Sequence, residues 1–434
     1  MVLNSFLNKL LIILYYNMRV LIVNTSERTG GAAIAANRLM EALKKNGIRA
    51  TMMVRDKQTS HITVTQKGGS IVMAIRFIWE RILAFLYTGF SKKDLWQIDV
   101  ASVGTKITDT DEFKRADVIH LHWVNQGYLS IKEIQRIIKS GKKVVITLHD
   151  MWYFTAVCHY SADCDKYIQE CKQCPMLKGN FLWGDMAKKV FLRKKRAYRD
   201  NDITFVGCSK WMSERAKEAE LTQGKNVVNI PNPINIELFK PIDKKKAKEG
   251  MKLPQDRTLI LFGSQKITDE RKGFRLLSQA CEILREKYPI IAQNATVVVV
   301  GEQSEVMKDL IPLEVISVDY ISDEKSMVML YNAVDIYVTP SLQDNLPNTI
   351  MEAMACAIPC VGFNVGGIPE MIEHKKTGYV AEYKNPNDFA EGIAWTVNHE
   401  NYQNLANCAR EKVIKEYKEE HVARLYIDIY ERNK

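Results

Sequence analysis

Short, continuously apolar segments alternate with helical patterns along almost all of this 434-residue chain, and this alternation constrains the fold more than any other feature. Strands buried on both faces of a parallel sheet have such uninterrupted apolar runs, and the intervening helices cover the two faces of the sheet. The pattern therefore predicts an α/β protein built on doubly wound parallel sheets.

The expected strands form two series, separated by a charged stretch that begins near residue 243. The first series covers residues 20–24, 50–54, 118–122, 144–148, 204–208 and 227–230, and the second covers residues 259–262, 296–300, 336–339, 360–363 and 379–381. We predict an N-terminal domain over residues 18–238, a C-terminal domain over residues 239–408, and a last helix within residues 409–434 that crosses back to the N-terminal domain. Two such domains would face each other across a cleft, where open α/β folds bind ligands.

Residues 1–17 precede the first expected strand and carry an apolar run that is shorter than the roughly 20 residues of a membrane-spanning helix. We interpret this segment as an over-extended start of the reading frame, with a peripheral anchor as the alternative. No other stretch reaches eighteen uninterrupted apolar residues. The expected location is the cytoplasm, either free or peripheral at the inner face of the cytoplasmic membrane.

The chain has 61 Lys+Arg against 51 Asp+Glu, and this net charge of +10 suits an acidic partner such as a phosphate or an anionic lipid surface. A composition of 46% hydrophobic and 26% charged residues is a poor fit to disordered, fibrous and polytopic membrane classes. Because no nucleic-acid-binding motif accompanies the positive charge, we expect no nucleic-acid partner.

Two helical segments are candidates for contact with an anionic membrane. Residues 188–199 are strongly basic with an apolar seam, and residues 73–87 are rich in aromatic and aliphatic side chains. Basic amphipathic helices dock onto anionic lipid, which would bring a lipid-linked molecule within reach. The alternatives are a solvated helix face for the first segment, and a groove for a second substrate or ordinary core packing for the second.

Four of the nine cysteines, Cys158, Cys164, Cys171 and Cys174, lie within seventeen residues in the pattern C-x5-C-x6-C-x2-C. Four soft ligands can complete the tetrahedral shell of a structural zinc ion, although the x5 and x6 gaps are not those of a standard zinc knuckle. Free thiols or a redox pair are the alternatives. The other five cysteines are scattered along the chain, as is typical of proteins from a reducing compartment.

In the N-terminal half, two places at strand ends are candidate ligand contacts. Gly30 and Gly31 follow the first strand and open a helix, where backbone N–H groups can approach an anion, although a plain strand-to-helix turn is the alternative. His149 follows the strand 144–148, which places its imidazole where it can contact a sugar hydroxyl. His120 and His122, at the end of another strand, rank below it as cleft wall or second-substrate contacts.

In the C-terminal half, Asp344 and Glu352 flank a turn and the start of a helix. This arrangement suits a nucleoside diphosphate sugar, because backbone N–H groups can bind phosphate while carboxylates accept from hydroxyl groups. Lys272, with Arg271, lies in an earlier loop and can neutralise a departing diphosphate. A helix cap with a buried glutamate and a solvated charged loop are the alternatives.

From residue 18 onward the chain resembles the retaining nucleotide-sugar glycosyltransferases of family 4, the group 1 type. The residues that carry the resemblance are Ser341 to Cys356, which look like the E-x7-E motif, and Gly366 to Glu370, which look like the glycine turn behind it. Asp344 stands where the family usually has Glu, and the usual Arg before the phosphate-binding Lys is missing. The resemblance implies the GT-B fold, two Rossmann-like domains facing each other across a cleft.

The resemblance also implies roles for individual residues. Glu352 would bind the nucleotide ribose, and Asp344 and His149 would lie near the donor sugar. Lys272 would face the phosphates, with Arg271 in place of the missing Arg. The remaining implied donor contacts are Gly30, Gly31, Leu346, Pro347, Asn348 and Thr349.

The implied reaction moves a sugar from a UDP- or GDP-sugar to a saccharide or lipid-linked acceptor, as in capsule or lipopolysaccharide assembly. The anomeric configuration would be retained by front-face attack, with no cofactor for catalysis. The alternative is a nucleotide-sugar-binding or scaffold protein with little turnover.

Overall fold

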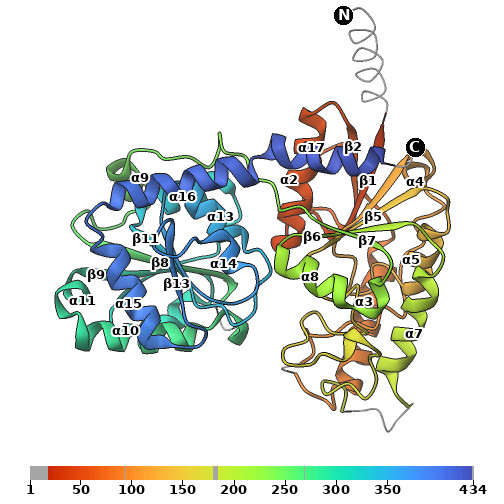
Figure 1. Cartoon of the computed structure of the whole chain (residues 1–434), viewed down its shortest axis with the longest axis horizontal. Coiled ribbons are helices and arrows are strands. Elements are labelled where there is room, and N and C mark those ends of the chain that lie inside the picture. Colours follow the sequence, from red (N-terminus) through yellow and green to blue (C-terminus); the bar gives the residue numbers. More distant parts are fainter. Residues whose placement is uncertain (1–17, 93, 179–183, 268, 433–434) are drawn as a thin grey trace, which may run out of the picture. The chain divides into compact units, whose positions relative to one another are not determined.

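The computed structural model describes residues 18–92, 94–178, 184–267 and 269–432. The chain divides into two compact units (Figure 1). Unit 1 consists of two segments, the residues up to Pro231 and those from Glu420 onward. Unit 2 is Asn232–Glu419. The apolar run predicted within residues 1–17 lies outside the described residues. None of the described helices is both long enough and apolar enough to cross a membrane.

Unit 1 is built on a seven-stranded sheet with the order β3-β2-β1-β4-β5-β6-β7, and every neighbouring pair is parallel. In the register of the central strands, Val23 of β1 lies opposite Met53 of β2 and Leu121 of β4. The strands are β1 Arg19–Ser26, β2 Arg49–Asp56, β3 Val64–Gln66, β4 Val118–Leu121, β5 Lys143–Leu148, β6 Ile203–Gly207 and β7 Asn226–Asn229.

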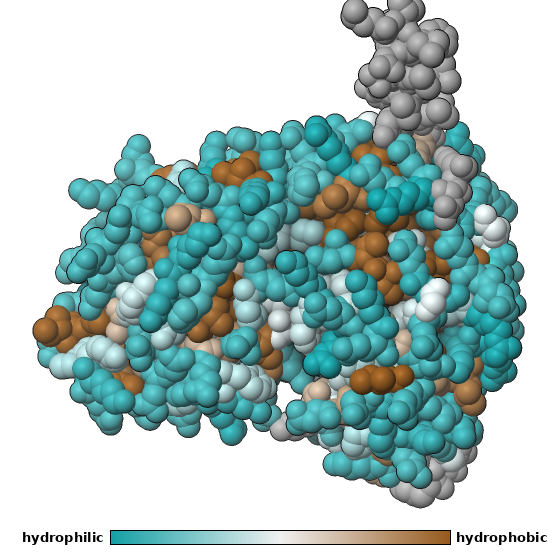
Figure 2. Space-filling view, viewed as in Figure 1, coloured by the Kyte–Doolittle hydropathy of each residue, from teal (hydrophilic) through white to brown (hydrophobic). Residues whose placement is uncertain are grey.

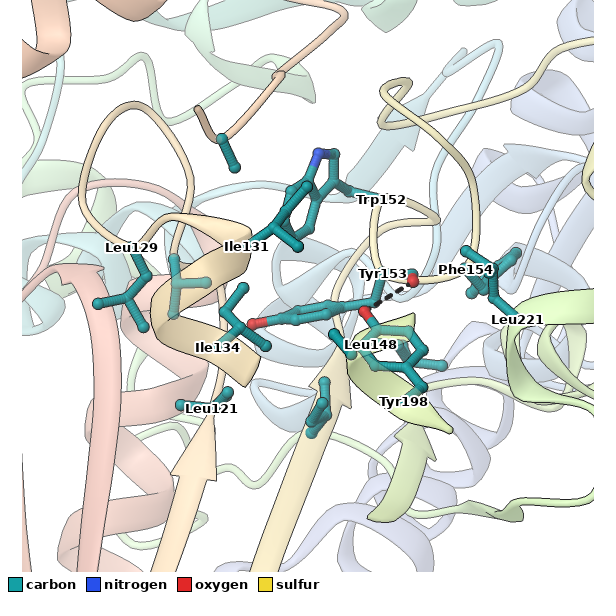
Figure 3. Packing of buried hydrophobic residues seen from close by; sticks show 14 of the residues in the cluster. Leu121, Leu129, Ile131, Ile134, Leu148, Trp152, Tyr153, Phe154, Tyr198 and Leu221 are labelled. Atoms are coloured by element: carbon teal, nitrogen blue, oxygen red, sulfur yellow. Dashed lines mark hydrogen bonds between the residues drawn. The ribbon is translucent and has the colours of Figure 1, made fainter. Parts of the chain in front are cut away.

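Helices cover both faces of this sheet because its central strands are apolar on both sides. In β1, Leu21 and Val23 face one hydrophobic cluster while Val20 and Ile22 face the other. Figure 3 shows part of the first cluster, in which the Tyr198 hydroxyl donates to the Tyr153 carbonyl at 3.0 Å. The helices of unit 1 before residue 232 are α2 Gly31–Lys45, α3 Ser70–Tyr87, α4 Asp111–Arg115, α5 Ile131–Ile138, η1 Lys166–Ile168, α7 Met186–Tyr198, α8 Lys210–Glu218 and η2 Glu220–Thr222.

Unit 2 has a six-stranded parallel sheet with the order β10-β9-β8-β11-β12-β13. Its strands are β8 Thr258–Lys266, β9 Ala295–Glu302, β10 Glu314–Val318, β11 Ile336–Thr339, β12 Cys360–Phe363 and β13 Gly378–Ala381. Its helices are α9 Lys244–Gly250, η3 Glu270–Lys272, α10 Phe274–Lys287, α11 Pro289–Asn294, η4 Ser304–Asp309, α12 Glu324–Ala333, α13 Asn348–Ala355, α14 Ile368–Met371, α15 Pro386–Val397 and α16 Tyr402–Tyr417. The two sheets confirm the predicted doubly wound α/β class.

The C-terminal segment, expected as one helix, is two helices: α16 ends at Tyr417 and α17 spans Glu419–Glu431. The break at Lys418 is held by Ile234, whose N–H donates to the Tyr417 carbonyl at 2.9 Å and whose carbonyl accepts from Glu419 N–H at 3.1 Å. These bonds tie the segment after Pro231 to α16, so unit 2 begins at Asn232, before the expected boundary at residue 239. Helix α17 lies beside α2 and shares its hydrophobic cluster (Figure 1).

Candidate functional site

The sequence-predicted residues Lys272 and Asp344 meet in unit 2. Lys272 ends η3, just after β8, and Asp344 lies in the loop between β11 and α13. Because β8 and β11 are parallel neighbours, both loops emerge at the same sheet edge. The Lys272 Nζ lies 2.7 Å from Asp344 Oδ2, and the two side chains are only 23% and 12% exposed.

Glycines hold these loops in close contact. Gly273 has φ +72°, and a Cβ there would lie 1.8 Å from the Pro340 carbonyl oxygen. Gly366 has φ +58°, and a Cβ there would lie 1.8 Å from the Asp344 carbonyl oxygen. Both positions therefore require glycine, for the backbone conformation and for space. The glycine turn thereby fixes the backbone that carries Asp344.

Asp344 is an ionised carboxylate in this arrangement. Burial alone would raise its pKa, but Lys272 and then Arg271 hold the pKa below its ordinary value. The Ser341 hydroxyl also donates to Asp344 at 3.3 Å. Arg271 itself donates to the Gln343 carbonyl at 3.4 Å and pairs with Asp269 at 3.3 Å. The site thus couples two cations to one partly buried anion.

Glu352 lies one turn into α13 and is buried. The Tyr331 hydroxyl of α12 donates to Glu352 Oε2 at 2.8 Å and orients the carboxylate. Tyr337 of β11 donates to the Thr349 hydroxyl at 2.8 Å. Sequence analysis missed both tyrosines, although a tyrosine on the strand that leads into the motif is a signal that could have been weighed.

The start of α13 presents the other predicted donor contacts in unit 2. Leu346 is buried, Pro347 occupies the N-cap, and Asn348 and Thr349 form the first turn. The first N–H groups of a helix have no partner within it, and the helix dipole makes this end favourable to negative charge. The geometry of Lys272, Asp344 and α13 can therefore bind a phosphate beside a hydroxyl-rich group.

In unit 1, Gly30 is the N-cap of α2 with φ +90°, and Gly31 begins the helix. A Cβ on Gly30 would meet nothing within 4 Å, so its backbone is open to a close approach. The preceding loop is anchored by Glu27, a buried residue that sequence analysis missed. Its carboxylate accepts from the N–H groups of Gln58 and Thr59 at 2.6 and 2.9 Å.

His149 directly follows β5, is half-buried, and lies among other polar side chains. Its Nε2 lies 2.8 Å from His122 Nδ1, and its Nδ1 lies 3.7 Å from Cys208 Sγ. Burial lowers the pKa of His149 to about 4, although Asp150 acts in the opposite direction. The imidazole is therefore neutral at pH 7 and can serve as a hydrogen-bonding group.

His120 and His122, expected as cleft-wall or second-substrate contacts, are buried in the core. His120 Nδ1 lies 2.7 Å from the Tyr430 hydroxyl of α17, and its Nε2 lies 2.7 Å from the Thr147 hydroxyl. The two histidines lie two residues apart at the end of β4, so both point to the same face of the sheet. His120 joins α17 to the sheet of unit 1.

The two candidate membrane segments differ in exposure. In α7, Lys194 is buried with Val190 and Phe191, which corrects the expectation that it belongs to an exposed basic face. Helical periodicity places it on the apolar seam. In α3 the outer side chains are exposed, Ile75 by 61% and Trp79 by 46%, so this stripe is not simple core. In the face shown in Figure 2, hydrophobic residues lie among mainly hydrophilic ones.

The four clustered cysteines lie in the irregular loop between β5 and α7, and all four line one cavity of about 20 Å³. None is in a disulfide. Among the described residues, which include these four cysteines, no group of three or more His, Cys, Asp or Glu side chains is arranged so that it could hold a metal ion.

Comparison with known proteins finds a family match within unit 2. Residues 256–399 match the family model of glycosyl transferases group 1, and this range contains Lys272, Asp344 and Glu352. The matched range lies wholly within unit 2, and the chain spans about 62% and 45% of the length of the first two curated relatives that it matches. An uncharacterized glycosyltransferase of Haemophilus influenzae is 30% identical over 232 residues, which cover 50% of this chain and 62% of that protein. The N-acetyl-alpha-D-glucosaminyl L-malate synthase of Bacillus anthracis is 27% identical over 173 residues, 38% of this chain and 45% of that protein.

Solved glycosyltransferase structures confirm the predicted GT-B class of two Rossmann-like domains. Sucrose-phosphate synthase from Thermosynechococcus elongatus superposes with a TM-score of 0.67 at 17% identity, covering 95% of this chain and 98% of that one. The Anabaena protein HepE in complex with UDP-glucose superposes with a TM-score of 0.61 at 15% identity, covering 95% and 98%. The chain thus shares its overall fold with these two proteins.

Proposed function

We propose that this protein is a retaining glycosyltransferase that moves a sugar from a nucleoside diphosphate sugar to a saccharide or lipid-linked saccharide, in the assembly of a surface polysaccharide such as capsule or lipopolysaccharide. The observation that carries the proposal is the partly buried ion pair of Lys272 and Asp344 beside the start of α13, within the range that matches the group 1 model.

Lys272 is suited to the diphosphate of the donor. An ammonium group has three N–H donors, and Asp344 accepts one of them. Phosphate oxygens would take the others, with the first turn of α13 and Arg271 adding positive potential. UDP-glucose bound to the HepE structure supports a UDP- or GDP-sugar as the donor class.

Glu352 and Asp344 are suited to the hydroxyl groups of the donor. Tyr331 orients one carboxylate oxygen of Glu352, and the resemblance to family 4 favours the ribose as the partner of this carboxylate. Asp344 accepts from Lys272 through one oxygen, so its second oxygen can accept from the donor sugar. His149 is neutral, so it can bond a sugar hydroxyl in place of its long contact with Cys208.

In the proposed mechanism the acceptor hydroxyl attacks from the face that the diphosphate leaves, and a phosphate oxygen takes the acceptor proton. No protein nucleophile is required, and we propose that no metal takes part. The side chains then act by stabilising the charge that develops on the leaving diphosphate, which is commonly the largest contribution to catalysis.

The acceptor side belongs to unit 1 in this proposal. Helix α3 exposes Ile71, Ile75, Ile78, Trp79 and Ile82 along one stripe. Exposed apolar stripes with tryptophan suit the membrane interface, and the net charge of +10 suits anionic lipid. We therefore propose a cytoplasmic protein that docks peripherally on the inner membrane face to reach a lipid-linked acceptor.

The test is donor hydrolysis by the full chain across a panel of UDP-, GDP- and ADP-sugars, with the released anomer followed by proton NMR. We expect one donor to be cleaved with retention and Glu352→Ala to abolish cleavage while the circular dichroism spectrum is kept. Binding of a nucleotide sugar without cleavage, even with acceptor lipids added, would favour the binding or scaffold function. Cleavage with inversion would contradict the retaining mechanism.

A further inference from the structure

A second imidazole lies next to His149 in unit 1. His122 directly follows β4 and His149 directly follows β5, and these two strands are parallel neighbours. The His122 Nδ1 lies 2.8 Å from His149 Nε2, and the two ring planes differ by only 28°. This near-coplanar arrangement lets the N–H of one ring point at the lone pair of the other, so one hydrogen bond joins the two rings.

His122 is held in place on several sides. The residue is only 1% exposed. Its backbone N–H donates to the Val23 carbonyl at 2.9 Å, and its carbonyl accepts from the Tyr153 hydroxyl at 2.8 Å. The ring of His120 packs against its ring with centroids 4.3 Å apart. A buried ring with these contacts has little freedom to turn, so its Nδ1 constrains where His149 Nε2 can lie.

The hydrogen-bond partners of the two rings assign their protons. Burial lowers the pKa of both histidines, so at pH 7 each ring is neutral and carries one N–H. In the part of the chain that the structure describes, the buried Nε2 of His122 has no hydrogen-bond partner. A proton on that nitrogen would be a buried N–H without an acceptor, which folded proteins rarely contain. The proton of His122 therefore lies on Nδ1, and Nδ1–H donates to His149 Nε2.

This hydrogen bond determines where His149 carries its own proton. Because Nε2 accepts, the single proton of the neutral ring lies on Nδ1. That nitrogen is 3.7 Å from the Cys208 sulfur. Burial raises the pKa of Cys208, so the group remains a thiol, whose sulfur is a weak acceptor. An oxygen of a ligand is a stronger acceptor and can take the N–H from this sulfur.

We propose that His122 is a positioning residue that fixes the proton of His149 on Nδ1, so that His149 offers a ligand an N–H and not a lone pair. His149 then acts as a hydrogen-bond donor and not as a general base. The inference rests on the proposed function only in assigning the donor sugar as this ligand. A hydroxyl oxygen of the sugar would accept from Nδ1–H.

The test is the tautomer of His149, read by nitrogen-15 NMR on the histidine-labelled full chain without any nucleotide sugar. The protonated and unprotonated nitrogens of a neutral imidazole have widely separated chemical shifts. The signals that disappear in His149→Gln identify this residue among the eight histidines. We expect the proton on Nδ1 in the wild-type chain. A proton on Nε2 would overturn the proposal, and this measurement needs no variant of His122.

Two variants of His122 separate the donated proton from the bulk of the ring. His122→Asn keeps an N–H donor near the place of Nδ1, whereas His122→Phe keeps a ring and removes the donor. We expect the His149 proton to stay on Nδ1 in the first variant and to move at least partly to Nε2 in the second. His120→Asn alters a neighbouring ring whose nitrogens bond to Tyr430 and Thr147, and it should leave the tautomer unchanged. An unchanged tautomer in folded His122→Phe would contradict the proposal.

Donor cleavage gives the second readout. His122→Phe should lower the turnover of a nucleotide sugar by about tenfold, because one hydrogen bond to the sugar is lost, and should keep the affinity for the nucleoside diphosphate. His122→Asn should restore most of the turnover. Equal turnover in His122→Phe and wild type would overturn the role of His122. A wild-type chain that has the Nδ1 proton but cleaves no donor would contradict the proposed function and support the tautomer assignment.

Discussion

The ammonium nitrogen of Lys272 lies 2.7 Å from a carboxylate oxygen of Asp344, although 72 positions separate the two residues in the chain. The pairing arises because β8 and β11 are parallel neighbours whose following loops meet at one sheet edge. A lysine held in this way is positioned before any phosphate arrives, so less entropy is lost when the phosphate binds.

Replacing Lys272 by Met should lower the rate of donor cleavage by about 10²–10³-fold, because the departing diphosphate loses one charge-stabilising donor. The rate is measured as released nucleoside diphosphate at saturating donor. Lys266→Met removes an exposed lysine nearby in the same segment and should leave the rate unchanged. Equal losses in both variants would mean that general charge, and not the Lys272 position, governs the rate.

Tyr331→Phe should weaken nucleotide binding and lower the stability of unit 2, since the buried Glu352 carboxylate loses the hydroxyl that orients it. A hydrogen bond to a charged group is worth about 1.5–3 kcal/mol, which sets the expected loss of stability. Nucleotide titration and thermal unfolding give the two readouts. Tyr402→Phe, which removes a hydroxyl bonded to the Asp335 carbonyl, should leave nucleotide affinity unaltered. Unchanged affinity in Tyr331→Phe would separate Glu352 from the nucleotide.

Gly366→Ala should destabilise the protein far more than Gly224→Ala. Both glycines have positive φ, +58° and +71°, so each alanine costs about 1–2 kcal/mol for the backbone conformation. Only at Gly366 would the added Cβ also clash, 1.8 Å from the Asp344 carbonyl oxygen, whereas nothing lies within 4 Å at Gly224. Thermal unfolding midpoints compare the two variants, and similar midpoints would contradict the close packing of the glycine turn on Asp344.

Acid should destabilise unit 1 through its buried histidines. Burial and then the nearby His149 lower the pKa of His120 to about 3. Between the ordinary histidine pKa and this value only the unfolded chain takes up the proton, so stability falls as pH falls, by up to about 1.4 kcal/mol per pH unit for each such histidine. The thermal unfolding midpoint of His120→Asn should therefore decline less steeply between about pH 6.5 and about pH 5 than that of the wild-type protein. The exposed His61→Asn should decline as wild type does, and parallel curves for all three proteins would refute the assignment.

The buried strands could be predicted from sequence, whereas two of the four edge strands, β3 and β10, could not. β1, β5 and β9 are buried over most of their length and are therefore continuous apolar runs. β3 and β10 lie at the sheet edges, and their residues are partly exposed, so they lack this signal and were missed.

The positions of the candidate site residues followed from local motifs, but their partners did not. Asp344 and Glu352 stand out beside a helix start, whereas the bonds from Tyr331 and from Tyr430 depend on packing between distant segments. Lys194 shows a different limit: its charge suggested solvent, yet the spacing of Val190, Phe191 and Ala197 already placed it on the buried seam.

Calorimetric titration of the full chain with UDP, GDP and ADP tests the central claim most directly, namely that Lys272 and Glu352 hold a nucleoside diphosphate. We expect one of the three nucleotides to bind at a single site in the wild-type chain. The Lys272→Met and Glu352→Gln double variant should bind it at least about tenfold more weakly, a loss of about 1.4 kcal/mol or more. Equal affinity in the folded double variant, or no binding of any nucleotide to the wild-type chain, would contradict the account.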